Sequence, residues 1–270
     1  MQITCPFCGS SHYRSKTIDW RLNSILICCN CELGFDERHR EVDYENELTL
    51  PLDEKTLAKY YRFAQRSTGM LNAALESTAR DQQMPFNILE IGPGYGFMSE
   101  LLTKKIEVKN YYHLELNQML AKRLERQGKT VIRSLDAIDR VDMVILGHVL
   151  EHIGDAKALL DNLISSKLAP GGYLILFQTN HAGFIPRYLP MLWYGWQVVQ
   201  HHYHFTPRVF EKYCHVNQQA SIVSVNMYSL DLEASFSIKG LVKIFLKVVN
   251  LIIPENHYDA FIIILQKAVR

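Results

Sequence analysis

Two kinds of segment alternate along the chain from residue 86 onward. Strand candidates lie at residues 86–91, 110–115, 129–133, 141–146 and 172–178. Between or after them, apolar positions recur at helical spacing near residues 95–105, 117–127 and 155–168. Strands that alternate with helices indicate a parallel sheet with right-handed crossovers, so the pattern predicts an α/β fold.

Further segments flank this alternation. Residues 54–80 have a helical pattern, another helix is expected at residues 207–217, and apolar segments follow at residues 221–228 and 258–267. We therefore expect three parts in the chain. They are a small N-terminal ribbon at residues 1–45, a helical linker at residues 46–83 and the α/β domain at residues 84–270.

The N-terminal ribbon is indicated by cysteine spacing. Five of the six cysteines lie before residue 32, and four of them form the pairs Cys5-x2-Cys8 and Cys28-x2-Cys31. Two such pairs can place four thiolates tetrahedrally around a structural Zn²⁺. Gly9 and Gly34 fit the tight turns of zinc knuckles, and the segments "TIDW" and "SILIC" are expected to form strands of the ribbon.

The predicted zinc has four cysteine ligands and therefore no open coordination position for chemistry. We expect it to act as a scaffold, with a clamp on the substrate or partner as the alternative. Cys29 is poorly spaced from Cys31 and is expected to be a bystander, while Cys214 in a helical pattern is expected to be a core thiol. The competing interpretation is that the four paired cysteines are reduced thiols in an ordinary loop.

Composition and charge limit the function classes. Of the 270 residues 48% are hydrophobic and 21% are charged, which supports a packed core, and the net charge of +1 provides no basic field for nucleic acid. The N-terminus lacks a signal segment and no apolar run reaches membrane-spanning length, so we expect a cytoplasmic protein.

The stretch "NILEIGPGYGFMSELL" predicts a strand, a glycine turn and a helix. Its glycines Gly92, Gly94 and Gly96 give G-x-G-x-G, and Phe97 stands where a dinucleotide fingerprint needs its third glycine. Glu90, directly before the turn, fits a cationic ligand better than a pyrophosphate. Glu115 ends the second strand, where a carboxylate can accept both ribose hydroxyls. An amino group, a ribose and no phosphate describe S-adenosylmethionine.

Five segments in order, "ILEIGPGYG", "HLELN", "SLDAI", "VDMVILGHVLEHI" and "LAPGGYLILFQTN", resemble class I S-adenosylmethionine-dependent methyltransferases. With the leading cysteine pairs, the chain is similar to bacterial methyltransferases of small molecules, sugars and glycans. The resemblance implies a Rossmann-like seven-stranded sheet whose last strand is antiparallel. "SIVSVNMYSL" and "YDAFIIILQKAV" would supply its final strands.

The same resemblance implies roles for individual residues. Glu90 and the turn glycines Gly92, Gly94 and Gly96 would hold the methionine moiety, Glu115 the ribose and Asp136 the adenine amino group, and His148 would border the transferable methyl. Local interpretations compete with these. Glu90 could cap the following turn, Asp136 could be an ordinary turn residue, and Glu151 and His152 could brace the next helix.

A lid over the acceptor is expected at residues 179–206, which contain several histidines and two tryptophans suited to stacking on sugars or rings. Its segment "QHHYHFTP" resembles one in bacterial methyltransferases of sugars and other small molecules. In that match His201 is the leading base or substrate contact, with anchoring of the lid as an equal alternative. His148 and His152 are further catalytic candidates, and a second zinc at His201, His202 and His204 is disfavoured because no acid or cysteine is close in sequence.

These observations favour methyl transfer from S-adenosylmethionine to a small-molecule or sugar/glycan acceptor at oxygen. An RNA methyltransferase with a zinc ribbon is the alternative, although the near-neutral charge makes nucleic acid a disfavoured partner. A binding module without activity and an NAD-linked enzyme are weaker alternatives.

One late segment is unusual. In residues 238–253, Lys239, Lys243 and Lys247 form one basic stripe on an otherwise apolar helical pattern. This suits a helix at the surface of the inner membrane, and the alternative is packing on the domain or on a second subunit. The sequence does not predict an oligomeric state.

Overall fold

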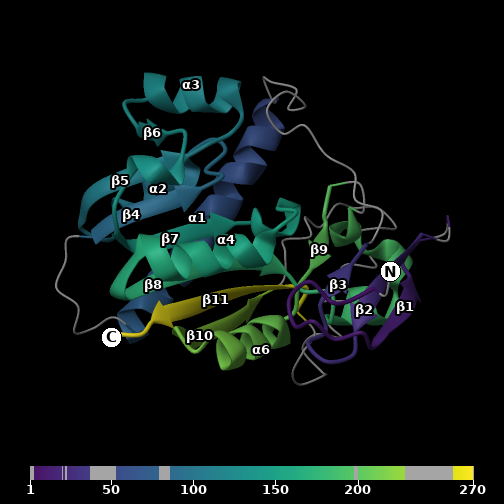
Figure 1. Cartoon of the computed structure of the whole chain (residues 1–270). Helices are drawn as coiled ribbons and strands as arrows, with labels where there is room; N and C mark the ends of the chain where they lie inside the picture. Colours follow the sequence, from purple (N-terminus) through teal and green to yellow (C-terminus); the bar gives the residue numbers. More distant parts are fainter. Residues whose placement is uncertain are drawn as a thin grey trace.

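A seven-stranded mixed sheet organises the larger part of the computed structural model, which describes residues 3–19, 21, 23–36, 53–78, 86–197, 200–228 and 258–269 (Figure 1). The strand order is β10-β11-β8-β7-β4-β5-β6. The strands are β4 (Phe86–Ile91), β5 (Val108–Leu114), β6 (Thr130–Ile132), β7 (Val141–Gly147), β8 (Leu168–Thr179), β10 (Ala220–Tyr228) and β11 (Ala260–Lys267). The five from β4 to β8 pair in parallel, whereas β11 is antiparallel to both β8 and β10. This confirms the expected Rossmann-like sheet with an antiparallel last strand.

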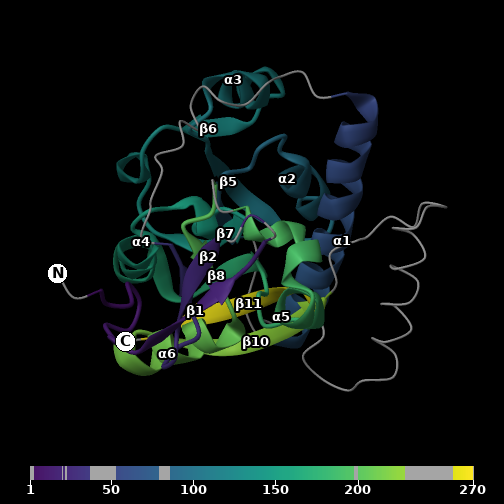
Figure 2. The same cartoon turned by 90° about the vertical axis from the view of Figure 1, so that its right-hand side faces the viewer.

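Helices cover both faces of the sheet, as Figure 2 shows. On one face α1 (Glu54–Thr78) and α2 (Phe97–Leu102) pack on the side chains of Met143 and Ile145 in β7. On the other face α4 (Ala156–Asn162) and α6 (Pro207–Asn217) pack in the core that contains Val144 and Leu146. Both faces of β7 are buried along residues 143–146, which explains why these four consecutive residues are all apolar.

The remaining helices are short or lie at an edge. α3 (Gln118–Arg126) lies beside β6, and its first turn is capped by Asn117, whose side chain accepts from the N–H groups of Met119 and Leu120. The helix expected at residues 155–168 is α4 followed by a π-helical turn (Leu163–Lys167). The lid contains α5 (Phe184–Tyr188), and 3-10 turns lie at Leu135–Ala137, Leu150–His152, Pro190–Leu192 and Tyr194–Trp196.

The segment expected as a linker is a single 25-residue helix, α1. Its residues Leu71, Ala74 and Leu75 are buried in the same core as β4, β7 and β8. α1 therefore stabilises the sheet by apolar burial, in addition to following the ribbon in the chain.

A second, four-stranded sheet contains the N-terminal segment. Its order is β1 (Tyr13–Thr17), β2 (Ser24–Cys28), β3 (Gly34–Phe35) and β9 (Tyr203–His204). The strand expected at "TIDW" is wrong, because β1 ends at Thr17. The Asp19 carboxylate instead closes a turn by accepting from the N–H groups of Arg21 and Asn23.

Strand β9 belongs to the lid, so the ribbon and the lid share one sheet (Figure 1). The two chains approach so closely at Gly34 that a Cβ there would lie 3.0 Å from the His204 Cβ. Gly34 thus serves strand pairing, while the turn after Cys28 places Glu32 at φ 66°. Further contacts join the parts: Lys16 Nζ donates to the Pro186 carbonyl at 2.6 Å, and Arg208 pairs with Glu32 at 3.0 Å.

The amphipathic helix expected at residues 238–253 lies outside the described residues. Within the part of the chain that the structure describes, no helix is long and apolar enough to cross a membrane.

Candidate active site

Glu90, the second-last residue of β4, has a carboxylate enclosed by protein. Its side chain is 5% exposed, and Tyr111 Oη on the neighbouring strand donates to Glu90 Oε2 at 2.9 Å. Burial raises the pKa of Glu90 to about 7, against the lowering effects of Tyr111 and Lys129. A carboxylate in this environment gains strongly from a cationic partner.

The glycine turn after β4 follows the predicted positions. Gly92, Gly94 and Gly96 all have positive φ, at 64°, 56° and 73°. A Cβ on Gly92 would lie 2.5 Å from Val149 Cγ2, so this glycine allows the turn to contact the segment after β7. A Cβ on Gly94 would meet no atom within 4 Å, which leaves the backbone of that residue accessible to a ligand.

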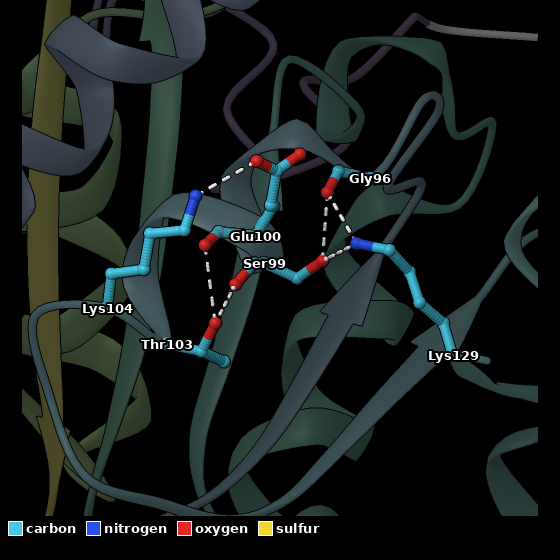
Figure 3. Close-up of polar contacts among 6 residues, drawn as sticks. All are labelled: Gly96, Ser99, Glu100, Thr103, Lys104 and Lys129. Atoms are coloured by element: carbon cyan, nitrogen blue, oxygen red, sulfur yellow. Dashed lines mark hydrogen bonds and ion pairs between the residues drawn. The ribbon is translucent and has the colours of Figure 1, made fainter. Parts of the chain in front are cut away.

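Lys129 fastens the end of this turn, as Figure 3 shows. Its ammonium donates to the Gly96 carbonyl at 2.7 Å and to Ser99 Oγ at 2.6 Å, and Ser99 Oγ also donates to the Gly96 carbonyl. These bonds hold the start of α2 against residues that follow α3. This role of Lys129 was not predicted, because its hydrogen-bond partners lie 30 and 33 positions away in the sequence.

Glu115 lies directly after β5 and is 8% exposed. Its two oxygens accept from the N–H groups of Gly94 at 3.0 Å and Asn117 at 2.9 Å. Burial raises the pKa of Glu115 despite these hydrogen bonds. The carboxylate is therefore held beside the glycine turn, at the carboxyl edge of the sheet where α/β folds bind ligands.

Asp136 lies farther along the same edge, in the 3-10 turn after β6. Its side chain is exposed, and its backbone N–H donates to Ser134 Oγ at 3.1 Å. This is the environment of an ordinary turn, and the exposed carboxylate is also accessible to a ligand.

His148 follows β7 and has a φ of 54°, a rare conformation for a residue with a side chain. Its Nδ1 lies 3.3 Å from Oε1 of the buried Glu151. Burial would raise the pKa of Glu151, but the hydrogen bond and charge of His148, with His201 and His152 nearby, lower it to about 2. Glu151 is therefore ionised in the protein interior.

The lid brings a further histidine to this acid. His201 is 6% exposed and forms an edge-to-face contact with His152, with ring centroids 4.6 Å apart. Burial lowers the pKa of His201 to about 4, so its imidazole is neutral at physiological pH. The structure thus brings together the three predicted catalytic histidines His148, His152 and His201 around Glu151. From its sequence position, Glu151 was expected to brace the next helix.

The lid tryptophans expected to stack on an acceptor lie elsewhere in the structure. Trp193 and Trp196 are buried against Ile18, Ile25 and Ile27 of the ribbon, so they form its contact with the lid and are not exposed to an acceptor. Aromatic rings near the glycine turn come from α1 instead: Tyr60 stacks on Tyr95, and Phe63 packs on His148 with ring centroids 5.3 Å apart. The aromatic cluster "YYRF" within the predicted helix was the available signal for them.

The four predicted zinc ligands are adjacent in space. The sulfur atoms of Cys5 and Cys31, and those of Cys8 and Cys28, are 3.5 Å apart, and all four lie within 4.8 Å of one another. This is too far for disulfides, and it fits a tetrahedron with Zn–S distances of about 2.3 Å. Cys29 is exposed and outside this group.

Comparison with known proteins agrees with this geometry. The family model described as "Methyltransferase domain" matches residues 55–218, more than half of the chain. Ribosomal RNA small subunit methyltransferase A of Mycoplasmoides gallisepticum is 35% identical over 103 residues, which is 37% of this chain and 36% of that relative. The match thus spans about a third of the relative's length.

Two solved structures share the fold. The plantazolicin methyltransferase BpumL in complex with SAH is 14% identical, with a TM-score of 0.52 over 80% of this chain and 90% of that chain. Magnesium protoporphyrin IX methyltransferase of Synechocystis PCC 6803 with bound SAH is 16% identical, with a TM-score of 0.52 over 82% and 90%.

The sheet order and the glycine turn are those of the Rossmann-like methyltransferase fold, which these two structures share. With its family-model match over residues 55–218, the chain belongs to the methyltransferase domain family.

Replacement of Glu115 by alanine is expected to weaken binding of S-adenosylmethionine by about 10- to 100-fold, because hydrogen bonds to a charged group contribute about 1.5–3 kcal/mol. The Gly94 N–H would also lose its acceptor, so a lower melting temperature is expected. Isothermal titration calorimetry measures the first effect. Glu107→Ala, at an exposed residue before β5, is the matched control and should bind normally. Unchanged affinity in the Glu115 variant would remove this residue from the site.

Proposed function

We propose that the protein transfers the methyl group of S-adenosylmethionine to a hydroxyl oxygen of a small-molecule or sugar/glycan acceptor. When bound, the cofactor supplies a methyl group on a positively charged sulfur. Glu90 would hold its ammonium group, the Gly92 and Gly94 backbone its methionine moiety, Glu115 its ribose and Asp136 its adenine. The buried, raised-pKa carboxylate of Glu90 and the unfilled space at Gly94 support this assignment.

The observation that carries the acceptor proposal is the junction of the lid with the end of β7. The His202 N–H donates to the Glu151 carbonyl at 2.8 Å, and His152 Nδ1 contacts the Gln200 carbonyl at 3.0 Å. At this junction Glu151 lies close to His148, His152 and His201, and Val149 of the same segment packs against Gly92 of the glycine turn. A hydroxyl nucleophile needs a nearby group that takes its proton or orients it, and this cluster offers such groups.

We also propose that the four cysteines hold a structural zinc. The proximity of their four sulfur atoms supports this proposal. A ribbon this small also has little core of its own, so a metal ion would supply part of its folding free energy. Since β3 pairs with β9, the zinc would support the lid, which favours scaffolding over direct substrate contact.

RNA methylation is the second candidate, and the similarity to a ribosomal RNA methyltransferase over 103 residues favours it. The net charge of +1 counts against it, because binding to RNA is dominated by neutralisation of phosphates.

An assay with methyl-labelled S-adenosylmethionine separates the two candidates. We expect label in hydroxyl-bearing small molecules or sugars, none in RNA, and weak RNA retention on filters with little dependence on salt. Glu115→Ala, which should bind the cofactor poorly, is the control for background transfer. Strong salt-dependent retention together with labelled RNA would contradict the acceptor proposal and support the second candidate.

A further inference from the structure

Glu151, His152 and His201 form a cluster with the dimensions of a metal site. One ligand atom from each residue lies within 4.8 Å of the other two. Glu151 and His152 come from the 3-10 turn after β7, and His201 comes from the lid. The cluster is separate from the four cysteines of the ribbon.

The two histidines are oriented through their backbone contacts. His152 Nδ1 lies 3.0 Å from the Gln200 carbonyl, and His201 Nδ1 lies 3.0 Å from the Gly195 carbonyl. A carbonyl oxygen only accepts, so each Nδ1 carries the hydrogen and each Nε2 holds the lone pair. Metal-binding histidines are typically oriented in this way, with the second nitrogen donating to a carbonyl or carboxylate.

The acid has an unused oxygen. Glu151 is 1% exposed, and its Oε1 is oriented by His148 Nδ1 at 3.3 Å. Its Oε2 is buried and has no hydrogen-bond partner among the described residues. Leaving a buried carboxylate oxygen without a partner costs free energy unless a cation or a donor occupies the adjacent position.

We propose that Glu151 Oε2, His152 Nε2 and His201 Nε2 bind a divalent transition-metal ion of the zinc type. Two histidines and one carboxylate are a common ligand set for catalytic zinc, and three protein ligands leave a coordination position open. His148, which contacts Glu151, is a positioning residue for the carboxylate. Its backbone has φ 54°, a conformation that is unfavourable for a residue with a side chain and that the surrounding structure must impose.

The open position gives the ion a role that rests on the proposed function. A hydroxyl oxygen of the acceptor that binds there releases its proton to solvent more readily. The same oxygen then forms a bond to the methyl carbon as the carbon–sulfur bond breaks, so that the electron pair of that bond stays on sulfur. Val149, two residues before Glu151, lies against the glycine turn, since a Cβ on Gly92 would be 2.5 Å from Val149 Cγ2.

Metal analysis of the full-length protein after dialysis against Zn²⁺ tests the site without acceptor or cofactor. We expect two zinc ions per chain in the native protein and one in Glu151→Gln and in His201→Ala. Cys5→Ser should also hold one, having lost the ion of the ribbon. His215→Ala, at an exposed histidine in α6, is the matched control and should hold two.

Cobalt added to native protein that already holds its ribbon zinc gives a second readout. We expect visible absorption without sulfur-to-cobalt charge transfer, and at least about a 100-fold loss of cobalt affinity in Glu151→Gln. One ion per chain in native protein, a thiolate spectrum of the added cobalt, or two ions in both variants would overturn the proposal. The native measurements decide even if a variant fails to fold. Because no acceptor is present, failure here is distinct from failure of the proposed acceptor class.

Discussion

Replacement of Glu90 by glutamine should stabilise the ligand-free protein at pH 8 and abolish its binding of S-adenosylmethionine. The folded-state pKa of Glu90 is about 7, above the ordinary value of 4.5, because burial disfavours the charged carboxylate. Between these two pH values the folded state binds more protons than the unfolded state. The free energy of unfolding therefore falls as the pH rises through this window and stays low above about 7. Removing the charge should recover about 3 kcal/mol at pH 8.

Whereas the free energy of unfolding falls as the pH rises, the affinity for the cofactor should increase. An ammonium group beside Glu90 favours the ionised carboxylate, so the affinity of the native protein should rise as the pH increases through about 7. Glutamine keeps an oxygen that can accept from Tyr111 but offers no charge. Urea unfolding at pH 5 and pH 8, with calorimetric titration of S-adenosylmethionine, measures both effects.

Tyr111→Phe is the matched control for the Glu90 variant. It removes the hydrogen bond to Glu90 but leaves the carboxylate, so it should shift the pH dependence of binding upward and retain measurable affinity. A Glu90→Gln protein that binds the cofactor normally, or that is less stable than native protein at pH 8, would contradict the assignment.

The main sheet was predictable because its signals are local. β4, β7 and β8 each contain an apolar run, and each crossover has a helical pattern or turn that the sequence displays directly. Glu90 and Glu115 were selected by their place at strand ends, and the structure buries both beside the glycine turn.

Contacts between distant segments were not predictable from these signals. The local sequence of the lid does not indicate that Tyr203 and His204 pair with the ribbon. It also does not indicate that Trp193 and Trp196 are buried in the contact with the ribbon. A tryptophan-rich loop has the same composition whether it stacks on a ligand or on another part of the chain. Glu151 was placed in a bracing role for the same reason, since His201 reaches it only through the fold.

Because the ribbon and the lid share one sheet, the proposed zinc should affect the lid, an effect that the cysteine pattern alone does not predict. Replacement of Cys5 by serine should remove the ribbon ion and reduce acceptor turnover by at least about 100-fold, while cofactor affinity remains near native. Strand β3 is the neighbour of β9, and Lys16 and Glu32 make further bonds to the lid, so loss of the ion should release residues 200–204. Displacement of a catalytic group by about 1 Å can cost this much rate.

Cofactor affinity should remain near native in Cys5→Ser, because Glu90, Gly94 and Glu115 belong to β4, β5 and the turns that follow them. In the strand order, β7 separates β4 and β5 from β8, the strand that leads into the lid. Zinc content measures loss of the ion, and hydrogen exchange measures release of the lid. Calorimetry measures cofactor affinity, and an activity assay measures acceptor turnover. Cys29→Ser is the matched control, since this exposed thiol lies outside the cysteine cluster, and it should behave like native protein. Equal loss of cofactor binding and turnover would mean that the ribbon supports the whole fold, and unchanged turnover would mean that the lid keeps its position without the ion. Selective loss of turnover is the outcome expected when the metal acts on the acceptor side through the β3–β9 pair.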